Sequence, residues 1–427
     1  MTKIIKFDYI TYNGYNNSAL ELHQYGAPAM CEPEPSREQS LENLKSEINQ
    51  EVQEHLNEIG LSDLDDDNQP SKEAIREIQQ EDRRRTAQRE EALLRDRGSE
   101  LIEHFAEGEE ICPEEMEPAL HFIDQADSTA GHLFRLATLI WSVPVSRGIG
   151  RRMRFLIRDH HTGKLIGLLA LGSPVFNLSA RDEWIGWNVE DREARLVNVM
   201  DAYVLGAVPP YARLLGGKLV GALATSSQVQ KRFRKRYGKR ESVSGAVKEA
   251  ELVLITATSA LGRSSLYNRL RLDGLFRYER LGWTEGYGHF HIPEPTFQKM
   301  RELLEREDHK YAEGYDFGDG PNWRIRVVRE ALDQVGLDSE LLHHGIQREV
   351  FGVPLVDNFR DYLCGRIDDT SVSRPSVSET AEAVKKRWII DRADRCPDYV
   401  EWSRRQIWEL MVSRLESEVP WSKNSSL

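Results

Sequence analysis

The sequence contains few cysteines and no long apolar run. Its four cysteines lie far apart with no paired spacing, which excludes a zinc ribbon and favours reduced thiols in a cytoplasm. No run of roughly eighteen apolar residues occurs, so no membrane-spanning helix is predicted. The first residues lack the apolar core and cleavage site of a signal peptide. We therefore expect a cytoplasmic protein that has no membrane partner.

The sequence also lacks a clear metal signature. No two carboxylates stand at a spacing typical of a two-metal site. Asp159 lies beside two histidines in an expected hairpin turn, and His289 and His291 would face the same side of an expected edge strand. Because no third ligand is evident, hydrogen-bonded histidines are favoured over metal ligands. A metal-dependent nuclease that uses these residues and Asp182 remains the weakest hypothesis.

Charge is distributed unevenly along the chain, whose formal net charge is −13. Residues 32–117 contain 27 acidic and 10 basic side chains, a net charge of −17, whereas residues 147–290 contain 24 basic and 13 acidic ones, a net charge of +11. A basic middle indicates a polyanion site. The alternative is that the acidic arms pack across the basic face and neutralise it.

The order of apolar runs predicts an α+β fold with an α/β-like core. We expect a central mixed sheet with a helix over 211–227 against one face, flanked by helical N- and C-terminal regions. The expected strands cover 153–158, 165–171, 203–208, 252–257 and 287–292. The expected parts are an acidic helical arm (1–110), the core (111–298), a helical extension (299–370) and C-terminal helices (379–427) after a Ser/Pro linker.

The turn between the expected strand 203–208 and the following helix is a candidate phosphate or coenzyme site. Glycines at a helix start allow close approach to the backbone, and the free N–H groups and helix dipole favour an anion there. The alternative is tight packing of the helix on its neighbours. The candidate residues are Val208, Arg213, Gly216, Gly217 and Lys218.

A dense basic run follows, with seven positive charges in residues 231–240. Interleaved aromatic residues suit phosphate contacts combined with base stacking. The alternative is a solvated helix end whose charges favour the C-terminal dipole. The candidate nucleic-acid residues are Arg213, Lys218, Lys231, Arg232, Phe233, Arg234, Lys235, Arg236, Tyr237, Lys239, Arg240 and Arg263.

Arg181 and Asp182 stand between two tryptophans and a glycine. The pair is either a buried ion pair or the polar part of an active site. A carboxylate beside its own arginine is held ionised and makes a poor general acid. The structural interpretation is therefore favoured.

Long ordered blocks of this sequence resemble a known family. The blocks are IWSVPVSRGIGRRMRFLIRD, RDEWIGW, DAYVLGAVPPYARLLGGKLVGAL, TATSALGRSSLYNRL and GWTEGYGHFHI. They are similar to component A of the Druantia anti-phage defence system, over about residues 98–365. The resemblance implies a role in phage resistance beside a large helicase-like partner. It implies no catalytic residue.

The order of elements also resembles the acetyltransferase-like fold of the Gcn5-related superfamily. In that superfamily an Arg/Gln-x-x-Gly-x-Gly/Ala turn holds the pyrophosphate of coenzyme A. Arg213 and Gly216 fit this pattern, but Lys218 stands where a small residue belongs. Tyr267 falls near the superfamily's tyrosine general acid. Acetyl-coenzyme A is thus a possible ligand, although tight binding is not expected.

Three hypotheses follow from the sequence. The first is a component of a defence complex that binds nucleic acid, DNA in particular, and has an acetyltransferase-like core that has lost its coenzyme. The second is an active acyl- or other group transferase that modifies nucleic acid or protein, with Tyr267, Asp182 and Arg181 as candidate catalytic residues. The third is the metal-dependent nuclease.

Overall fold

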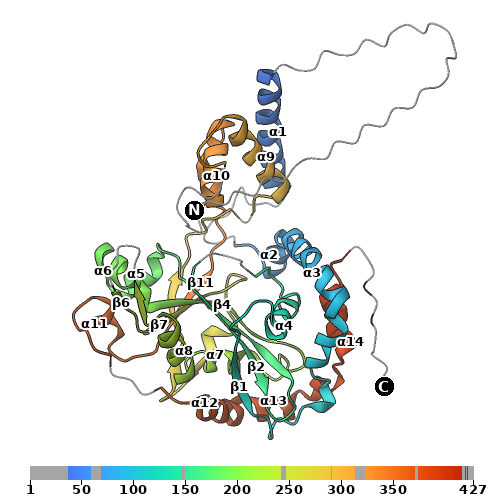
Figure 1. Ribbon diagram of the computed structural model, residues 1–427, viewed down its shortest axis with the longest axis vertical. Helices are drawn as coiled ribbons and strands as arrows, with labels where there is room; N and C mark the ends of the chain where they lie inside the picture. The colour runs from blue at the N-terminus through green and yellow to red at the C-terminus, as the bar shows by residue number, and fades with distance from the viewer. Residues whose placement is uncertain are drawn as a thin grey trace, which may run out of the picture.

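The computed structural model describes residues 37–58, 69–145, 150–241, 247–289, 291–312, 323–370 and 374–415, with Val419 and Trp421. Its centre is a seven-stranded mixed sheet, surrounded by helices (Figure 1). The strand order is β1 (Pro118–Phe122), β2 (Arg152–Asp159), β3 (Leu165–Gly172), β4 (Val199–Ala207), β7 (Leu254–Thr258), β11 (Glu349–Pro354) and β10 (Glu279–Trp283). Neighbours are antiparallel except β4 and β7, which are parallel.

The mixed α+β fold is confirmed, and four of the five expected strands are present. The expected edge strand at 287–292 is wrong. Tyr287 forms only an isolated bridge with His343, because Gly286 adopts φ +71° and turns the chain there. The edge position belongs instead to β10, which pairs with β11.

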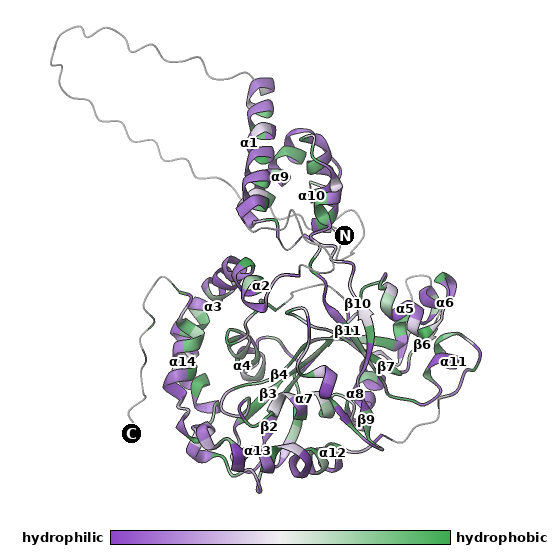
Figure 2. Cartoon of the chain, turned by 180° about the vertical axis from the view of Figure 1, so that it is seen from behind, coloured by the Kyte–Doolittle hydropathy of each residue, from purple (hydrophilic) through white to green (hydrophobic). Residues whose placement is uncertain are grey.

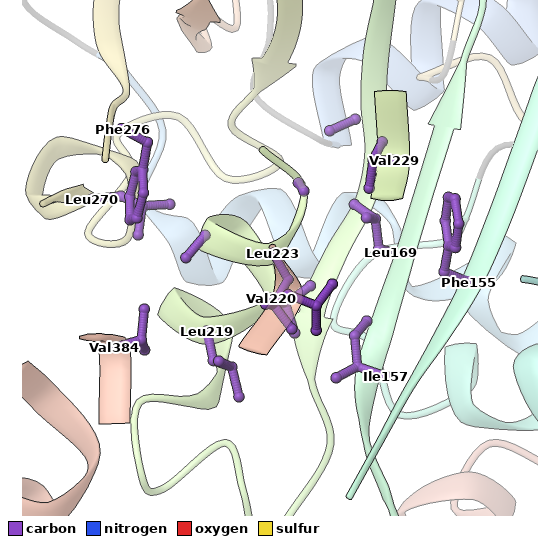
Figure 3. Packing of buried hydrophobic residues seen from close by; sticks show 14 of the residues in the cluster. Phe155, Ile157, Leu169, Leu219, Val220, Leu223, Val229, Leu270, Phe276 and Val384 are labelled. Carbon is purple, nitrogen blue, oxygen red and sulfur yellow. The ribbon is translucent and has the colours of Figure 1, made fainter. Parts of the chain in front are cut away.

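One face of the sheet carries the central helices. α7 (Gly216–Leu223) packs on β3 and β4, and α8 (Ser227–Tyr237), α12 (Val377–Val384) and a ribbon of β8 (Arg271–Leu272) and β9 (Phe276–Arg277) complete this layer. Figure 3 shows Leu219, Val220 and Leu223 pointing from α7 towards Ile157 and Leu169 of the sheet. The single helix expected over 211–227 is therefore a turn followed by the shorter α7, and α8 starts separately. A π-helical turn (Lys385–Ile389) and α13 (Ile390–Arg395) follow α12.

The opposite face is covered by two groups of helices. The first comprises α3 (Gln80–Leu101), α4 (Thr129–Thr138) and α14 (Arg404–Val412), and the second comprises α5 (Ser179–Ile185), α6 (Val189–Arg195) and α11 (Phe359–Leu363). Figure 2 shows α3 as mostly hydrophilic at the rim, with hydrophobic strands inside. Although α3 is rich in charged residues, it buries a narrow stripe that includes Ala87 and Leu94. Gly98 lets α3 approach α14 closely, because a Cβ atom there would stand 2.5 Å from the Trp408 ring.

A separate helical cluster stands beside the sheet (Figure 1). It consists of α1 (Arg37–Glu58), α9 (Glu294–Arg306) and α10 (Trp323–Gln334). The helical spacing of Leu44, Ile48 and Val52 places all three in this core. The expected acidic arm is therefore divided, because α1 joins this cluster whereas α2 (Lys72–Ile78) and α3 lie against the main body. Within the described part of the arm, α3 belongs to the core on the other side of the sheet, and only Ala106 joins the cluster that contains α8.

Two short elements complete the fold. A small ribbon pairs β5 (Lys239–Glu241) with β6 (Val247–Glu249) directly after α8. A 3-10 turn (Tyr267–Arg269) lies between β7 and β8. Among the described helices, none combines the length and apolarity needed to cross a membrane.

Candidate nucleic-acid interface and polar clusters

The inner face of α8 contains the aromatic residues of the basic run. Val229, Phe233 and Tyr237 recur every four residues and are all buried. The Tyr237 hydroxyl accepts a hydrogen bond from the backbone N–H of Arg152 at 2.9 Å and donates one to its carbonyl oxygen at 3.0 Å. This burial contradicts a base-stacking role for Phe233 and Tyr237. The repeat of four in the sequence is the signal that predicts their inward direction.

The outer face of α8 carries the cations. Lys231, Lys235 and Arg236 are exposed, and no ion pair joins any of them to a carboxylate within the described ranges. Lys231 and Lys235, four residues apart, lie on the same face of the helix. Arg236 is turned about 140° from Lys231, and its guanidinium lies 5.4 Å from the centre of the Phe122 ring.

The remaining basic residues of this run have acidic partners. Arg232 pairs with Asp124, Arg234 lies 2.7 Å from Glu251, and Lys239 lies 3.8 Å from Glu249. The side chain of Arg240 lies outside the described part of the chain. Arg263 is exposed on a loop after β7 and does not belong to α8.

The 208–218 turn uses its own N–H groups. The amides of Ala212, Arg213, Leu214, Gly216 and Lys218 all donate to carbonyl oxygens of the same turn. A Cβ atom on Gly216 would stand 2.6 Å from the Tyr211 carbonyl oxygen and 2.8 Å from the Ala207 Cβ. The glycine therefore serves close packing, and few N–H donors remain for the pyrophosphate of a coenzyme.

The two cations of this turn contact the C-terminal helices. Arg213 pairs with Asp398, and the Lys218 ammonium lies 4.4 Å from the centre of the Trp388 ring. Burial, followed by the nearby charges of Arg387 and Arg269, lowers the pKa of Lys218. Val208 is fully buried, whereas Gly217 has Leu266 as its nearest neighbour at 3.7 Å.

Arg181 and Asp182 form a buried ion pair, as the sequence favours. Arg181 is fully buried, and its Nη2 lies 2.6 Å from Asp182 Oδ1. Asp182 also accepts from Arg192 at 2.8 Å and from the Trp187 indole at 2.9 Å. Arg181 donates further to the carbonyl oxygens of residues 175 and 176. The pair thus fixes the loop after β3 and offers little free capacity for catalysis.

The candidate metal ligands do not meet. Asp159 is fully buried at the end of β2, where its carboxylate accepts hydrogen bonds from the Glu117 N–H at 2.9 Å and the Tyr211 hydroxyl at 3.2 Å. His291 lies 2.9 Å from the Leu341 carbonyl oxygen. Burial lowers the pKa of both His289 and His291 to about 4. In the part of the chain that is described, no three His, Cys, Asp or Glu side chains gather as metal ligands.

Tyr267 is a buried aromatic residue. Its ring stacks on Tyr278, with centroids 5.6 Å apart, and contacts Phe351 at 5.2 Å. Burial, followed by the charge of Asp201, raises the pKa of its hydroxyl. Both effects oppose proton release by this hydroxyl near neutral pH.

Asp201 is a polar residue that the sequence interpretation missed. It lies on β4 at the last residue paired with the parallel strand β7, and its carboxylate accepts a hydrogen bond from Thr256 at 2.8 Å. Desolvation raises its pKa to about 6, although Thr256, Arg181 and Arg152 act in the opposite direction. A carboxyl group with this pKa exchanges protons readily near neutral pH. An acidic residue within the apolar run VMDAYVL was the available signal.

A second basic segment was also missed. Its turn Asp273-Gly274-Leu275, between Arg271-Leu272 and Phe276-Arg277, is typical of a hairpin, which the structure forms as β8 and β9. The exposed arginines of this segment outside the expected set are Arg269, Arg271, Arg277 and Arg280.

The family comparison and the comparison with curated relatives point to the same family. The family model for Druantia protein DruA matches residues 69–365. Druantia protein DruA of Escherichia coli (strain UMEA 4076-1) is 43% identical over 373 residues, which cover 86% of this chain and 92% of that relative. No solved structure matches the chain.

Proposed function

Because the chain belongs to the Druantia DruA family, and is thus a component of an anti-phage defence system, we propose that it binds nucleic acid. The contact surface in this proposal is the outer face of α8, and DNA is the expected ligand. The protein would act in the cytoplasm and cooperate with a helicase-like partner of the same system. The proposal includes an acetyltransferase-like core, supported by the parallel β4–β7 pair beside α7.

The exposed cations of α8 carry this proposal. Lys231 and Lys235 lie on one face of a helix that the core holds through Phe233, and Arg236 is exposed next to Lys235. Three cations without acidic partners repel one another and attract the regularly spaced phosphates of a nucleic acid. Arg234 and Lys239 flank them with exposed side chains whose carboxylate partners are replaceable by phosphate.

The test is the salt dependence of binding by the full chain. Binding through three phosphates predicts a slope of about −3 for log affinity against log salt on duplex DNA. Replacing Lys231, Lys235 and Arg236 by glutamate should abolish this slope and weaken binding to all sequences equally, because phosphate contacts carry no sequence information.

A matched control changes the same amount of charge elsewhere. Arg84, Arg95 and Arg405 lie on α3 and α14, with 41%, 42% and 72% of their side chains exposed. Replacing these three by glutamate should leave the slope unchanged. An absence of salt-dependent binding to single- and double-stranded nucleic acid would refute the proposal, as would an equal loss in both triple variants.

An active group transferase is the second candidate function, and Asp201 is the observation that favours it. In open sheets, ligands bind beyond the carboxyl ends of parallel strands, and Asp201 lies where the only parallel pair of the described sheet separates. A transfer reaction in which Asp201 moves a proton should be abolished by Asp201→Asn, while Asp201→Glu should retain some activity. The assay is mass spectrometry of nucleic acid and partner proteins incubated with acetyl-coenzyme A. Equal modification by wild type and Asp201→Asn would exclude this role.

A further inference from the structure

A cavity of about 390 Å³ lies between the β8–β9 ribbon, the 3-10 turn at Tyr267–Arg269 and β10. This volume falls within the range of about 300 to 1,000 Å³ that is typical of small-molecule sites. Arg271 and Arg277 line it from the ribbon, Asn268 and Glu279 line it from the other elements, and Phe351 belongs to its apolar wall.

Arg271 and Arg277 stand directly opposite each other on the two strands of the ribbon. Both side chains are exposed, and across the described ranges no ion pair links either guanidinium to a carboxylate. Like charges in directly opposed positions destabilise a strand pair. These two guanidinium groups therefore carry positive charge that no ion pair among the described residues neutralises.

Other contacts hold the ribbon in this position. Leu272 faces Phe276 across the two strands, and the Tyr278 N–H donates to the Leu270 carbonyl oxygen at 3.0 Å. Arg374 donates to the carbonyl oxygen of Leu275 at the tip, also at 3.0 Å. Because these contacts fix the backbone, Arg271 and Arg277 stay opposite each other, and both side chains are in reach of one anion.

The other side of the cavity presents hydrogen-bond acceptors. The amide nitrogen of Asn268 donates to Ser264 O at 2.7 Å and to Glu349 at 2.9 Å, so its side-chain oxygen is left to accept. Glu279 contributes a carboxylate. Arg280 is held at 3.2 Å from Glu349 and lies 5.0 Å from the centre of the Trp283 ring.

We propose that this cavity binds a nucleotide through its phosphate. Arg271 and Arg277 contact the phosphate oxygens, which removes their mutual repulsion and forms charge-assisted hydrogen bonds. Glu279 and the oxygen of Asn268 accept hydrogen bonds from the sugar hydroxyls or from an amino group of the base. Inorganic phosphate lacks the sugar and the base that would reach these acceptors, so it should bind more weakly than a nucleotide. The phosphate belongs either to a free nucleotide or to one unit of a strand.

This site is independent of the outer face of α8. The test uses the full chain, with binding followed by calorimetry and by the thermal midpoint of unfolding. The probes are AMP, ATP, a 5′-phosphorylated trinucleotide and inorganic phosphate. Binding of AMP or ATP assigns the site to free nucleotides, and binding of the trinucleotide alone assigns it to a strand.

The test variant is Arg271→Gln with Arg277→Gln, and the control variant is Arg395→Gln with Arg405→Gln, two exposed arginines of α13 and α14 outside the cavity lining. The test variant should bind at least about tenfold more weakly for each arginine removed, since each charge-assisted bond is worth that much. Without ligand its thermal midpoint should equal or exceed that of the wild type, because the repulsion is gone. The control should bind as the wild type does.

Several results would overturn the proposal. These are no response to any phosphorylated probe, equal binding by the test variant, or binding of inorganic phosphate as tightly as of the nucleotides. None of them affects the salt slope expected from Lys231, Lys235 and Arg236, so failure here is distinguishable from failure of α8 as a nucleic-acid surface.

Discussion

Phe233→Ala separates a structural role of this aromatic ring from a base-stacking role. Phe233 is fully buried, its ring lies 5.6 Å from that of Tyr237, and the Arg151 guanidinium also stands 5.6 Å from its centre. Removing a buried phenylalanine costs about 3 to 5 kcal/mol, because apolar contacts are lost and a cavity remains. Because Phe233 has no exposed surface and its neighbours are fixed on the sheet, we expect Phe233→Ala to lower the free energy of unfolding by an amount within that range.

The measurement is urea unfolding followed by tryptophan fluorescence and circular dichroism. Lys235→Ala is the control, since an exposed residue on the same helix should change the free energy of unfolding by no more than about 0.5 kcal/mol. Nucleic-acid binding per folded molecule should be unchanged in Phe233→Ala. A loss of stability below about 1 kcal/mol, together with weaker binding of single strands only, would refute the burial of this ring.

Four further predictions concern single groups. Tyr237→Phe should cost about 1 to 3 kcal/mol in urea unfolding, because the backbone N–H and carbonyl of Arg152 lose their partner. Asp201 by itself should lower the free energy of unfolding by up to about 3 kcal/mol as pH rises from 4 to 6, because its folded carboxyl keeps its proton to about pH 6; the difference in free energy of unfolding between the wild type and Asp201→Asn should change by this amount over that range. His289 and His291 should each lower the free energy of unfolding by up to about 3 kcal/mol as pH falls from 6.5 to 4, because the folded protein disfavours their charged forms. Replacing either by glutamine should make the urea midpoint less sensitive to acid. Calorimetry should find no tight binding of acetyl-coenzyme A, and a dissociation constant in the low micromolar range would contradict this.

Local patterns predicted the inner strands because each contains an apolar run that only burial explains. β3 is buried at every residue, and its sequence, LIGLLALG, contains no polar side chain. β11 also contains an apolar run, but its place beside β7 depends on pairing across about ninety residues, which no local pattern encodes. β10 is a polar edge strand with only partial burial. The alternation at 287–292 resembled a strand more closely, yet Gly286 turns the chain there.

The candidate sites follow the same division between local and distant information. The ion pair of Arg181 and Asp182 was readable because both partners are adjacent in sequence. The partners of Arg213 and Lys218 were not, since Asp398 and Trp388 lie on helices near the C-terminus. A basic residue therefore looks equally available in the sequence whether or not a distant carboxylate or ring contacts it.

This distinction decides where a ligand can bind at lowest cost. A phosphate at Arg213 must first displace Asp398, and the turn around it has already used its N–H groups. A phosphate at Lys235 or between Arg271 and Arg277 displaces no carboxylate of the described chain, and at the second place it also removes a repulsion. Anion binding should therefore be strongest at the outer face of α8 and at the β8–β9 ribbon, and weakest at the glycine-containing turn that the sequence made most conspicuous.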